Sequence, residues 1–392
     1  MREDNHYGRG RVLRGPASVC ALAAGLLAAL VQTVGAQPGP NVVVWGSWSG
    51  VQMTPPDDAT NVLLVANAGA DALALRADGS VLAWGLDNEG QADVPPGLTN
   101  VVAVCVANDA SLALRAEGSV AAWGYNGTGQ TNVPVTLTNA VAVAAGGGVA
   151  MALRSDHTVV QWGSAGNHGA SVLAHLTNAA AVALSANDGF ALRADGTVVV
   201  WVDFADNVDA NPTNVPPDLT NAVAISAGDF FAMALRADGT ITVWGENLYG
   251  ETNVPSGLTN VVAIAAGGYH CLALRADGTV VAWGLDYDGQ TDVPPGLSNV
   301  VGISGGTYSS MAVVGAALPP SQVALTNFSF GPGGFTVQVP TDRGRVYELE
   351  YKNSLTDTQW QLLPLAAGTG GLVQLTDPSP SAAQRFYRVR RW

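Results

Sequence analysis

Residues 260–294 read NVVAIAAGGYHCLALRADGTVVAWGLDYDGQTDVP, and most of this pattern recurs along the chain. Tryptophan returns every 39 residues, with one spacing of 43, at Trp45, Trp84, Trp123, Trp162, Trp201, Trp244 and Trp283. An asparagine runs in phase with it, at Asn61, Asn100, Asn139, Asn178, Asn221, Asn260 and Asn299. A period of this length indicates a fold built from repeated structural units.

Each repeat is expected to form four short strands. The segment Val261–Gly267 is small and apolar, as an inner strand near a ring axis requires. Asp277-Gly278 predicts a tight turn between a second strand, Cys271–Arg275, and a third strand, Thr279–Trp283. The stretch Gly289–Pro294 would form an outer edge strand, where proline is tolerated.

The two ends of the repeat region complement each other. Val42–Gly46 matches a third strand with no first or second strand before it, and the seventh repeat stops after its second strand, near Val314. A sheet shared by both ends predicts an all-β, closed seven-bladed β-propeller over residues 37–317. A linear solenoid is the alternative, because any stacked repeat gives a periodic sequence.

The first 36 residues are expected to be a signal peptide. Arg9, Arg11 and Arg14 precede an apolar run over residues 19–34, which ends in small residues. A membrane span is the alternative, but the run is shorter than the roughly 20 residues that a helix needs to cross a bilayer. We therefore expect a secreted or cell-surface protein whose later residues do not span a membrane.

Residues 318–392 differ in composition and are expected to form a small second domain. Pro319-Pro320 lies in a linker-like stretch, and Phe335–Val339 and Val346–Tyr351 alternate apolar and polar residues. This pattern predicts an Ig-like or fibronectin-like β-sandwich. It loosely resembles C-terminal modules of secreted environmental bacterial proteins, which implies an association with the cell surface.

Charge restricts the partners of the repeat region. Residues 37–317 hold 6 Lys and Arg against 24 Asp and Glu, and residues 318–392 hold 7 against 5. So acidic a region should repel nucleic acid and anionic membranes. Cys105 and Cys271 fall four repeats apart and are expected to be small buried residues rather than a disulfide.

The motif Trp-Gly, five residues, Gln, two residues, Val-Pro occurs at residues 84–95, 123–134 and 283–294, together with Ala-Leu-Arg and a turn glycine. This pattern resembles the regulator of chromosome condensation repeat family, and in particular the bacterial branch typified by β-lactamase-inhibitor protein II. The resemblance implies a propeller. In the bacterial branch, aromatic side chains on loops at one face grip an enzyme. The founder's action on chromatin would need basic surfaces, which this acidic chain lacks.

The loops between the first and second strands are the candidate partner-binding site. Their aromatic residues gather in the last repeats, and the candidate contact residues are Phe190, Phe230, Phe231, Tyr269, His270 and Tyr308. Aromatic side chains with small and polar neighbours are common anchors of protein interfaces. The alternative is that these rings only cap the core.

The loops after each Trp-Gly are rich in carboxylates and are expected at the opposite face. Calcium or a cationic partner could bind them, and Asp203, Asp206 and Asp209 are the weak metal candidates. None of these loops has the spacing of a dedicated calcium loop, so solvated surface charge is the simpler interpretation. No metal or other cofactor is predicted.

No arrangement of residues indicates catalysis. His157, His168, His175 and His270 have no Ser, Cys or Asp partner at a recognised spacing. The six arginines of Ala-Leu-Arg are expected to pair with the carboxylates of the following turns. The sequence thus predicts a secreted protein–protein interaction module that is not an enzyme, with enzyme inhibition as a special case. The alternative is a carbohydrate- or calcium-binding surface protein that uses the acidic loops.

Overall fold

The computed structural model describes residues 41–47, 53–107, 109–163, 170–186, 188–202, 214–315, 326–331, 334–341, 346–354, 356–357, 360–367, 372–378 and 385–391. The described chain is almost entirely β-structure, with one short helix, α1 (Ala170–Leu173). No helix within these ranges is long and apolar enough to cross a membrane. The predicted signal peptide, residues 1–36, lies outside them.

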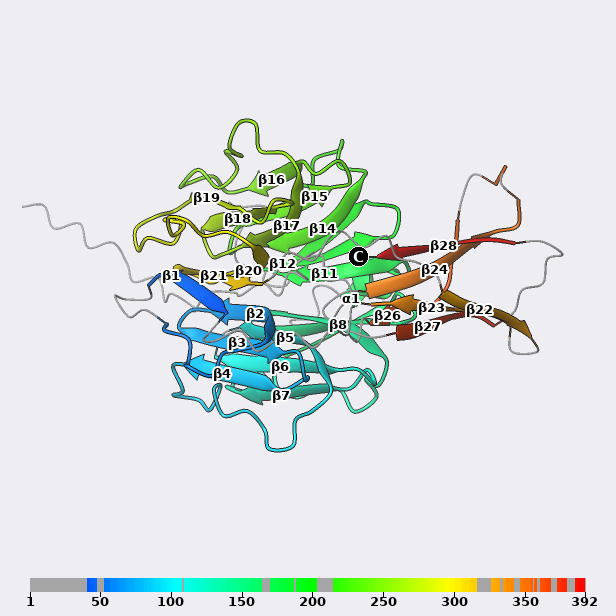
Figure 1. The fold of residues 1–392 in the computed structure, drawn as a ribbon, viewed down its shortest axis with the longest axis horizontal. Helices are drawn as coiled ribbons and strands as arrows, with labels where there is room; N and C mark the ends of the chain where they lie inside the picture. Colours follow the sequence, from blue (N-terminus) through cyan, green and yellow to red (C-terminus); the bar gives the residue numbers. More distant parts are fainter. Residues whose placement is uncertain are drawn as a thin grey trace, which may run out of the picture.

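Three-stranded antiparallel sheets follow one another along the repeats (Figure 1). The first three consist of β2 (Val62–Ala68), β3 (Asp71–Arg76) and β4 (Val81–Gly85); β5 (Val101–Ala107), β6 (Ala110–Arg115) and β7 (Val120–Gly124); and β8 (Ala140–Gly146), β9 (Val149–Arg154) and β10 (Val159–Gly163). The next three consist of β11 (Ala179–Leu184), β12 (Asp188–Arg193) and β13 (Val198–Val202); β14 (Ala222–Ala227), β15 (Phe231–Arg236) and β16 (Ile241–Gly245); and β17 (Val261–Ala266), β18 (His270–Arg275) and β19 (Val280–Gly284). The prediction of an all-β repeat is confirmed.

The fourth strand predicted for each repeat is wrong for the stretch Gly289–Pro294. There the Asp292 N–H donates to the Gly289 carbonyl (3.2 Å), and the Val293 N–H donates to the Thr291 carbonyl (2.9 Å). These backbone groups are satisfied in local turns, so they do not extend the sheet along the edge of β19.

Each middle strand is buried because neighbouring sheets pack on both of its faces. In β18, Leu272 and Leu274 pack in a cluster with Ile303 of β20 (Val300–Gly305). Cys271 and Ala273 point the other way and pack in a cluster with Met233 of the fifth sheet. Alternation with a period of two thus joins one sheet to both neighbours. The other free cysteine, Cys105, is also buried, which confirms the interpretation of both as core residues.

The seventh sheet contains strands from both ends of the repeat region. It consists of β20 (Val300–Gly305), β21 (Ser309–Val314) and β1 (Val42–Gly46), in the order β1-β21-β20. Val42 pairs with Val313, and Gly46 pairs with Ser309. Each of the inner strands β2, β5, β8, β11, β14 and β17 contacts the next inner strand, and β20 contacts β2.

Four of the recurring tryptophans join their sheet to the loop of the preceding repeat. Each indole N–H donates to the backbone carbonyl at the Gln position of that repeat, at 2.8–2.9 Å. The donor and acceptor pairs are Trp123 and Gln91, Trp162 and Gln130, Trp283 and Glu251, and Trp45 and Gln290. The Gln side chain in turn accepts a backbone N–H of its own loop, as in Asp288 N–H to Gln290 Oε1 (2.9 Å). The repeated Trp and Gln therefore act together as donor and acceptor of a hydrogen bond that joins neighbouring repeats.

The C-terminal strands form two further antiparallel sheets (Figure 1). One contains β22 (Thr326–Gly331), β23 (Gly334–Pro340) and β27 (Leu372–Asp377). In the other, β24 (Val346–Lys352) pairs with β25 (Gln361–Leu362), β26 (Ala366–Ala367) and β28 (Phe386–Arg391). Val337 and Val339 of the first sheet pack with Tyr347 and Leu349 of the second, so the two sheets share a core.

These C-terminal sheets, hereafter the C-terminal unit, contact the hairpin turn between β9 and β10. The Leu365 N–H donates to the Ser155 carbonyl (2.8 Å), and Leu365 is buried in the core of the third and fourth sheets. The His157 ring bonds to the Ala179 and Leu363 carbonyls, both at 3.1 Å, and its Nε2 lies 3.4 Å from Glu348 Oε1. His157 takes the place of the turn glycine of other repeats at a φ of 67°. A substitution in one repeat thus provides a contact for the C-terminal unit.

Candidate partner-binding face

The loop before the second strand and the loop after the third strand lie at the same end of each sheet. In the fifth sheet the Glu246 N–H donates to the Phe230 carbonyl (2.9 Å), and in the sixth the Leu285 N–H donates to the Tyr269 carbonyl (2.9 Å). Chain direction reverses at every antiparallel hairpin, so the start of the second strand meets the end of the third. The prediction that the carboxylate-rich loops lie at the opposite face is therefore wrong.

The glycine of Trp-Gly permits this close approach of the two loops. Gly245 and Gly284 have φ values of +108° and +105°, which side chains rarely adopt. A Cβ on Gly245 would lie 2.6 Å from the Phe230 carbonyl oxygen, and one on Gly284 would lie 2.7 Å from that of Tyr269. Glycine is therefore required where the two loops meet.

Five aromatic side chains from the fifth, sixth and seventh repeats form what we call the aromatic face: Phe230, Tyr249, Tyr269, Tyr287 and Tyr308. The ring centroids of Phe230 and Tyr269 are 6.1 Å apart. Tyr249 makes edge-to-face contacts with Tyr269 at 5.7 Å and with Tyr287 at 5.9 Å. Tyr287 is 80% exposed, and the other four rings are half-buried. Such rings can contact a partner while their neighbours hold them in place.

Carboxylates lie among these rings. Burial raises the pKa of the Tyr269 hydroxyl well above its usual range, and the nearby charges of Asp229 and Glu246 raise it further. The pKa of Tyr308 is raised by burial first and then by Asp229 and Asp288. Both phenols therefore stay protonated at neutral pH and can donate hydrogen bonds.

Three of the predicted contact residues are in the interior. Phe190 and Phe231 are each 1% exposed, and His270 is fully buried. Phe190 pairs with Ala183 inside its sheet, and the other two side chains lie over glycines, Phe231 over Gly228 and His270 over Gly267. Their assignment to a contact surface is therefore wrong, because they fill space between sheets.

His270 is a neutral core residue. Its Nε2 bonds to the Ser310 hydroxyl at 2.8 Å, across the boundary between the sixth and seventh sheets. Burial lowers the pKa of the imidazole to about 4, and the charge of Asp286 opposes this shift only in part. The ring is thus uncharged at neutral pH.

Tyr249 and Tyr287 were not among the predicted contact residues. They follow Trp244-Gly245 and Trp283-Gly284 by a few residues, in loops that were expected at the other face. The signal that could have placed them is the order of strands, because an antiparallel meander brings those loops back beside Phe230 and Tyr269.

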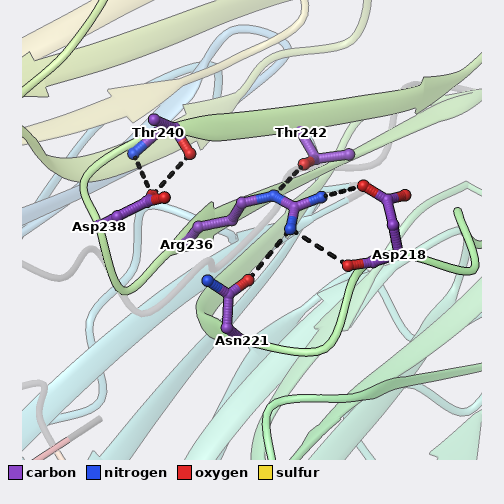
Figure 2. A network of polar contacts seen from close by, with 6 residues as sticks. All are labelled: Asp218, Asn221, Arg236, Asp238, Thr240 and Thr242. Atoms are coloured by element: carbon purple, nitrogen blue, oxygen red, sulfur yellow. Dashed lines mark hydrogen bonds and ion pairs between the residues drawn. The ribbon is translucent and has the colours of Figure 1, made fainter.

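The arginines of the repeats lie at the far end of the sheets from the aromatic face. Figure 2 shows Arg236, the last residue of β15, bonded to Asp218 (2.8 Å), Asn221 (3.1 Å) and Thr242 (2.8 Å). The turn carboxylate Asp238 instead accepts the Thr240 hydroxyl (2.6 Å) and the Thr240 N–H (3.0 Å), which lower its pKa. The predicted pairing of Arg236 with its own turn is therefore wrong.

In the first and second sheets, the end that corresponds to the aromatic face holds a carboxylate pair. Gln91 Nε2 lies 3.4 Å from an oxygen of Asp71 and 3.4 Å from an oxygen of Asp109. Burial and the charge of Asp109 raise the pKa of Asp71 to about 7. Within the described residues no group of three or more His, Cys, Asp or Glu side chains could hold a metal ion. The weak metal candidates Asp203, Asp206 and Asp209 lie outside the described residues.

A family model matches two segments of the chain. Residues 222–251 and 261–290 match the Regulator of chromosome condensation (RCC1) repeat. They contain the fifth and sixth sheets and four of the five rings of the aromatic face. A search of curated proteins by sequence finds no match.

Solved RCC1 structures have the same fold. Prp20p from Saccharomyces cerevisiae, whose structure was described with its binding to Gsp1p and histones, is 18% identical. The similarity covers 70% of this chain and 91% of Prp20p, with a TM-score of 0.53. Yeast RCC1 (Prp20) in its complex with Kap60 gives 18% identity, 80% and 96% coverage and a TM-score of 0.54. The repeated three-stranded sheets therefore match RCC1 propeller structures, and at this identity the likeness concerns fold alone.

Proposed function

We propose that the protein is an exported protein-interaction module, without enzymatic activity or cofactor, that binds a protein partner through the aromatic face. The observation that carries this proposal is the set of contacting rings across adjacent repeats, from half-buried Phe230 and Tyr269 to Tyr287, which is 80% exposed. Clusters of aromatic side chains in which some rings are half-buried and others are exposed are typical of interface hot spots.

A closed seven-bladed propeller is the frame that we propose for this face. The pairing of β1 with β21 and the contact between β20 and β2 support closure. A closed ring, in which every sheet packs between two neighbours, would hold the loops rigidly, which lowers the entropy lost on binding. We further propose that residues 1–36 direct export and that the C-terminal unit, as a small β-sandwich, associates with the cell surface.

Affinity capture tests the proposed function. The purified chain is used to capture proteins from the envelope and medium of the producing cells, beside the variants Tyr287→Ala and Tyr249→Ala/Tyr287→Ala. We expect a specific protein to be retained by the parent and reduced at least about tenfold by the double variant, since interface hot spots contribute roughly 2 kcal/mol or more.

Phe328→Ala is the matched control. Phe328 is 73% exposed and belongs to the C-terminal unit, so its truncation removes a comparable ring outside the aromatic face. Equal capture by the parent and the double variant, at equal melting temperature, would exclude the aromatic face as the binding site. Inhibition of an enzyme is a special case, tested by assaying any captured hydrolase with and without the chain.

A carbohydrate- or calcium-binding surface is the second candidate. It is favoured by Tyr287, an exposed ring with a carboxylate on each side in the sequence, because sugars stack on such rings and hydrogen-bond to carboxylates. Binding to a glycan array that is lost in Tyr287→Ala would support it. A rise in melting temperature with added calcium would support the calcium version.

A further inference from the structure

Building on the proposed function, we infer that the partner presents a basic surface to the aromatic face, with an arginine or lysine side chain set against the tyrosine rings. The inference rests on the exposed rings, on the distribution of charge over the repeats and on the position of the C-terminal unit.

The repeat region separates its charges by position. Residues 37–317 contain no lysine, and each of their six arginines is the last residue of a middle strand. A strand of six residues is about 17–20 Å long, so these guanidinium groups start far from the loops at the other end. The aromatic face therefore has no cation of its own on any loop.

Carboxylates are frequent where cations are missing. The backbone N–H of Glu246 donates to the Phe230 carbonyl, and Asp229 precedes Phe230 in the sequence. Asp286 and Asp288 stand on either side of Tyr287. The influence of Asp229, Glu246 and Asp288 on the phenols of Tyr269 and Tyr308 indicates that these charges lie near the rings. An uncharged or acidic partner would have to bring these carboxylates out of water without compensation.

The rings themselves suit a cation. Tyr249 stands edge-on to both Tyr269 and Tyr287, so neighbouring ring planes differ by 85° and 76°. Ring faces turned in different directions form the sides of a site for an alkylammonium or guanidinium group, which binds to the negative face of a ring. The surrounding carboxylates would add charge-assisted hydrogen bonds.

The described contacts of the C-terminal unit with the repeats lie at the arginine end of the sheets. They include the hydrogen bonds between Leu365 and Ser155 and between His157 and Leu363. The basic strand of the same chain, β28, belongs to the C-terminal unit, so a basic segment from another molecule is the occupant that fits the charges of the aromatic face.

Binding of defined peptides to the full-length protein tests the inference. The probes are three fluorescent 12-residue peptides. Each consists of four Gly-Ser-X units, in which X is Arg, Lys or Glu. We expect the Arg and Lys peptides to bind at least tenfold more tightly than the Glu peptide at 50 mM salt. We also expect their affinity to fall at least fivefold at 300 mM salt, because exposed charges are screened. Tyr249→Ala/Tyr287→Ala should weaken Arg-peptide binding at least fivefold.

A pair of charge-matched variants separates a defined site from general attraction. Glu246→Gln/Asp288→Asn removes two charges beside the rings, whereas Glu89→Gln/Asp93→Asn removes two exposed charges from the loop of the first repeat. The first variant should weaken Arg-peptide binding at least fivefold and the second less than twofold. Equal effects of the two variants, or no preference for basic peptides, would overturn the inference.

The same variants distinguish this inference from the proposed function. A captured protein that is lost with Tyr249→Ala/Tyr287→Ala but retained with Glu246→Gln/Asp288→Asn, in low and high salt alike, would uphold the aromatic face as a binding site and refute a basic partner. A captured protein whose retention is unchanged by Tyr249→Ala/Tyr287→Ala would refute both the proposed function and the inference of a basic partner. If the captured molecule is a second copy of this chain, its basic surface would have to consist of arginines at the arginine end of the repeats or in the C-terminal unit, and substitution of those arginines would abolish capture.

Discussion

At the scale of single residues, one position of the repeat shows how a shared geometry can hold different chemistry. Gln91, Gln130 and Gln290 are buried and accept a backbone N–H two residues before them. Glu251 occupies the same place, is 1% exposed and accepts the Tyr249 N–H at 2.8 Å. The fifth repeat thus buries a carboxyl group where these three repeats bury an amide, and this carboxyl group is bonded to the backbone of Tyr249, a residue of the aromatic face.

Glu251→Gln should stabilise the protein at neutral pH. Burial, with a smaller effect of Glu246, raises the pKa of Glu251 in the folded state. The ionised form is thus disfavoured on folding, and the parent loses stability as pH rises from its unfolded pKa, near 4.5, through its folded pKa. We expect the variant to exceed the parent by about 0.5–2 kcal/mol in free energy of unfolding at pH 7. Urea denaturation at pH 4 and pH 7 measures this difference.

The pH dependence is the decisive part of that experiment. Both chains should have similar free energies of unfolding near pH 4, where the carboxyl group is protonated in either state. A difference between parent and Glu251→Gln that is constant from pH 4 to pH 7 would contradict the assignment to ionisation.

At the scale of strands and loops, the close approach of the Tyr269 loop to the loop after β19 depends on Gly284. Gly284→Ala should lower the free energy of unfolding by about 1–3 kcal/mol, because the new Cβ would lie 2.7 Å from the Tyr269 carbonyl oxygen at an unfavourable φ. Thermal and urea denaturation measure the loss.

Gly257→Ala controls for the φ value alone. Gly257 has a φ of +75°, and a Cβ there meets no atom within 4 Å. We therefore expect Gly257→Ala to be less destabilising than Gly284→Ala and to leave partner binding unchanged. Equal destabilisation by the two would show that the contact with Tyr269 is unimportant.

The sequence was sufficient for strands whose signal is repeated and local. Asp277-Gly278 predicted its turn correctly, since the Gly278 N–H donates to the Arg275 carbonyl at 3.0 Å. The sequence was insufficient where local turns and a sheet compete for the same backbone hydrogen bonds, as in Gly289–Pro294, where turns form in place of the predicted strand.

At the candidate site, Phe230, Tyr269 and Tyr308 were predicted in the right loops and lie half-buried there. Burial of Phe231 and His270 depended on space above Gly228 and Gly267, which spacing alone does not reveal.

At the scale of the whole molecule, His157 connects the repeats to the C-terminal unit. His157→Gly removes the bonds to the Leu363 and Ala179 carbonyls, while the φ of 67° favours glycine, so the turn itself should not be strained. We expect faster hydrogen exchange of residues 361–367, in particular of the Leu365 amide, with a change in repeat stability below about 1 kcal/mol. Hydrogen exchange followed by mass spectrometry measures this.

His157→Asn provides a second test of the same contact. Asparagine tolerates a positive φ but is shorter than histidine, so it should also speed exchange of the Leu365 amide. Unchanged exchange in both variants would mean that the buried Leu365 side chain alone holds the C-terminal unit.

The pairing of Val42 with Val313 has a consequence for how the chain is made. The first strand of the repeats is synthesised before any other, yet its hydrogen-bonding partner is among the last. Until the ribosome has passed the seventh repeat, the nascent chain carries an unpaired β1 and a row of sheets with an open edge, both exposed to chaperones and to neighbouring chains. The sheet that contains β1 can therefore be completed only after its partner β21 has emerged, which places the pairing of β1 late in the folding of the repeat region.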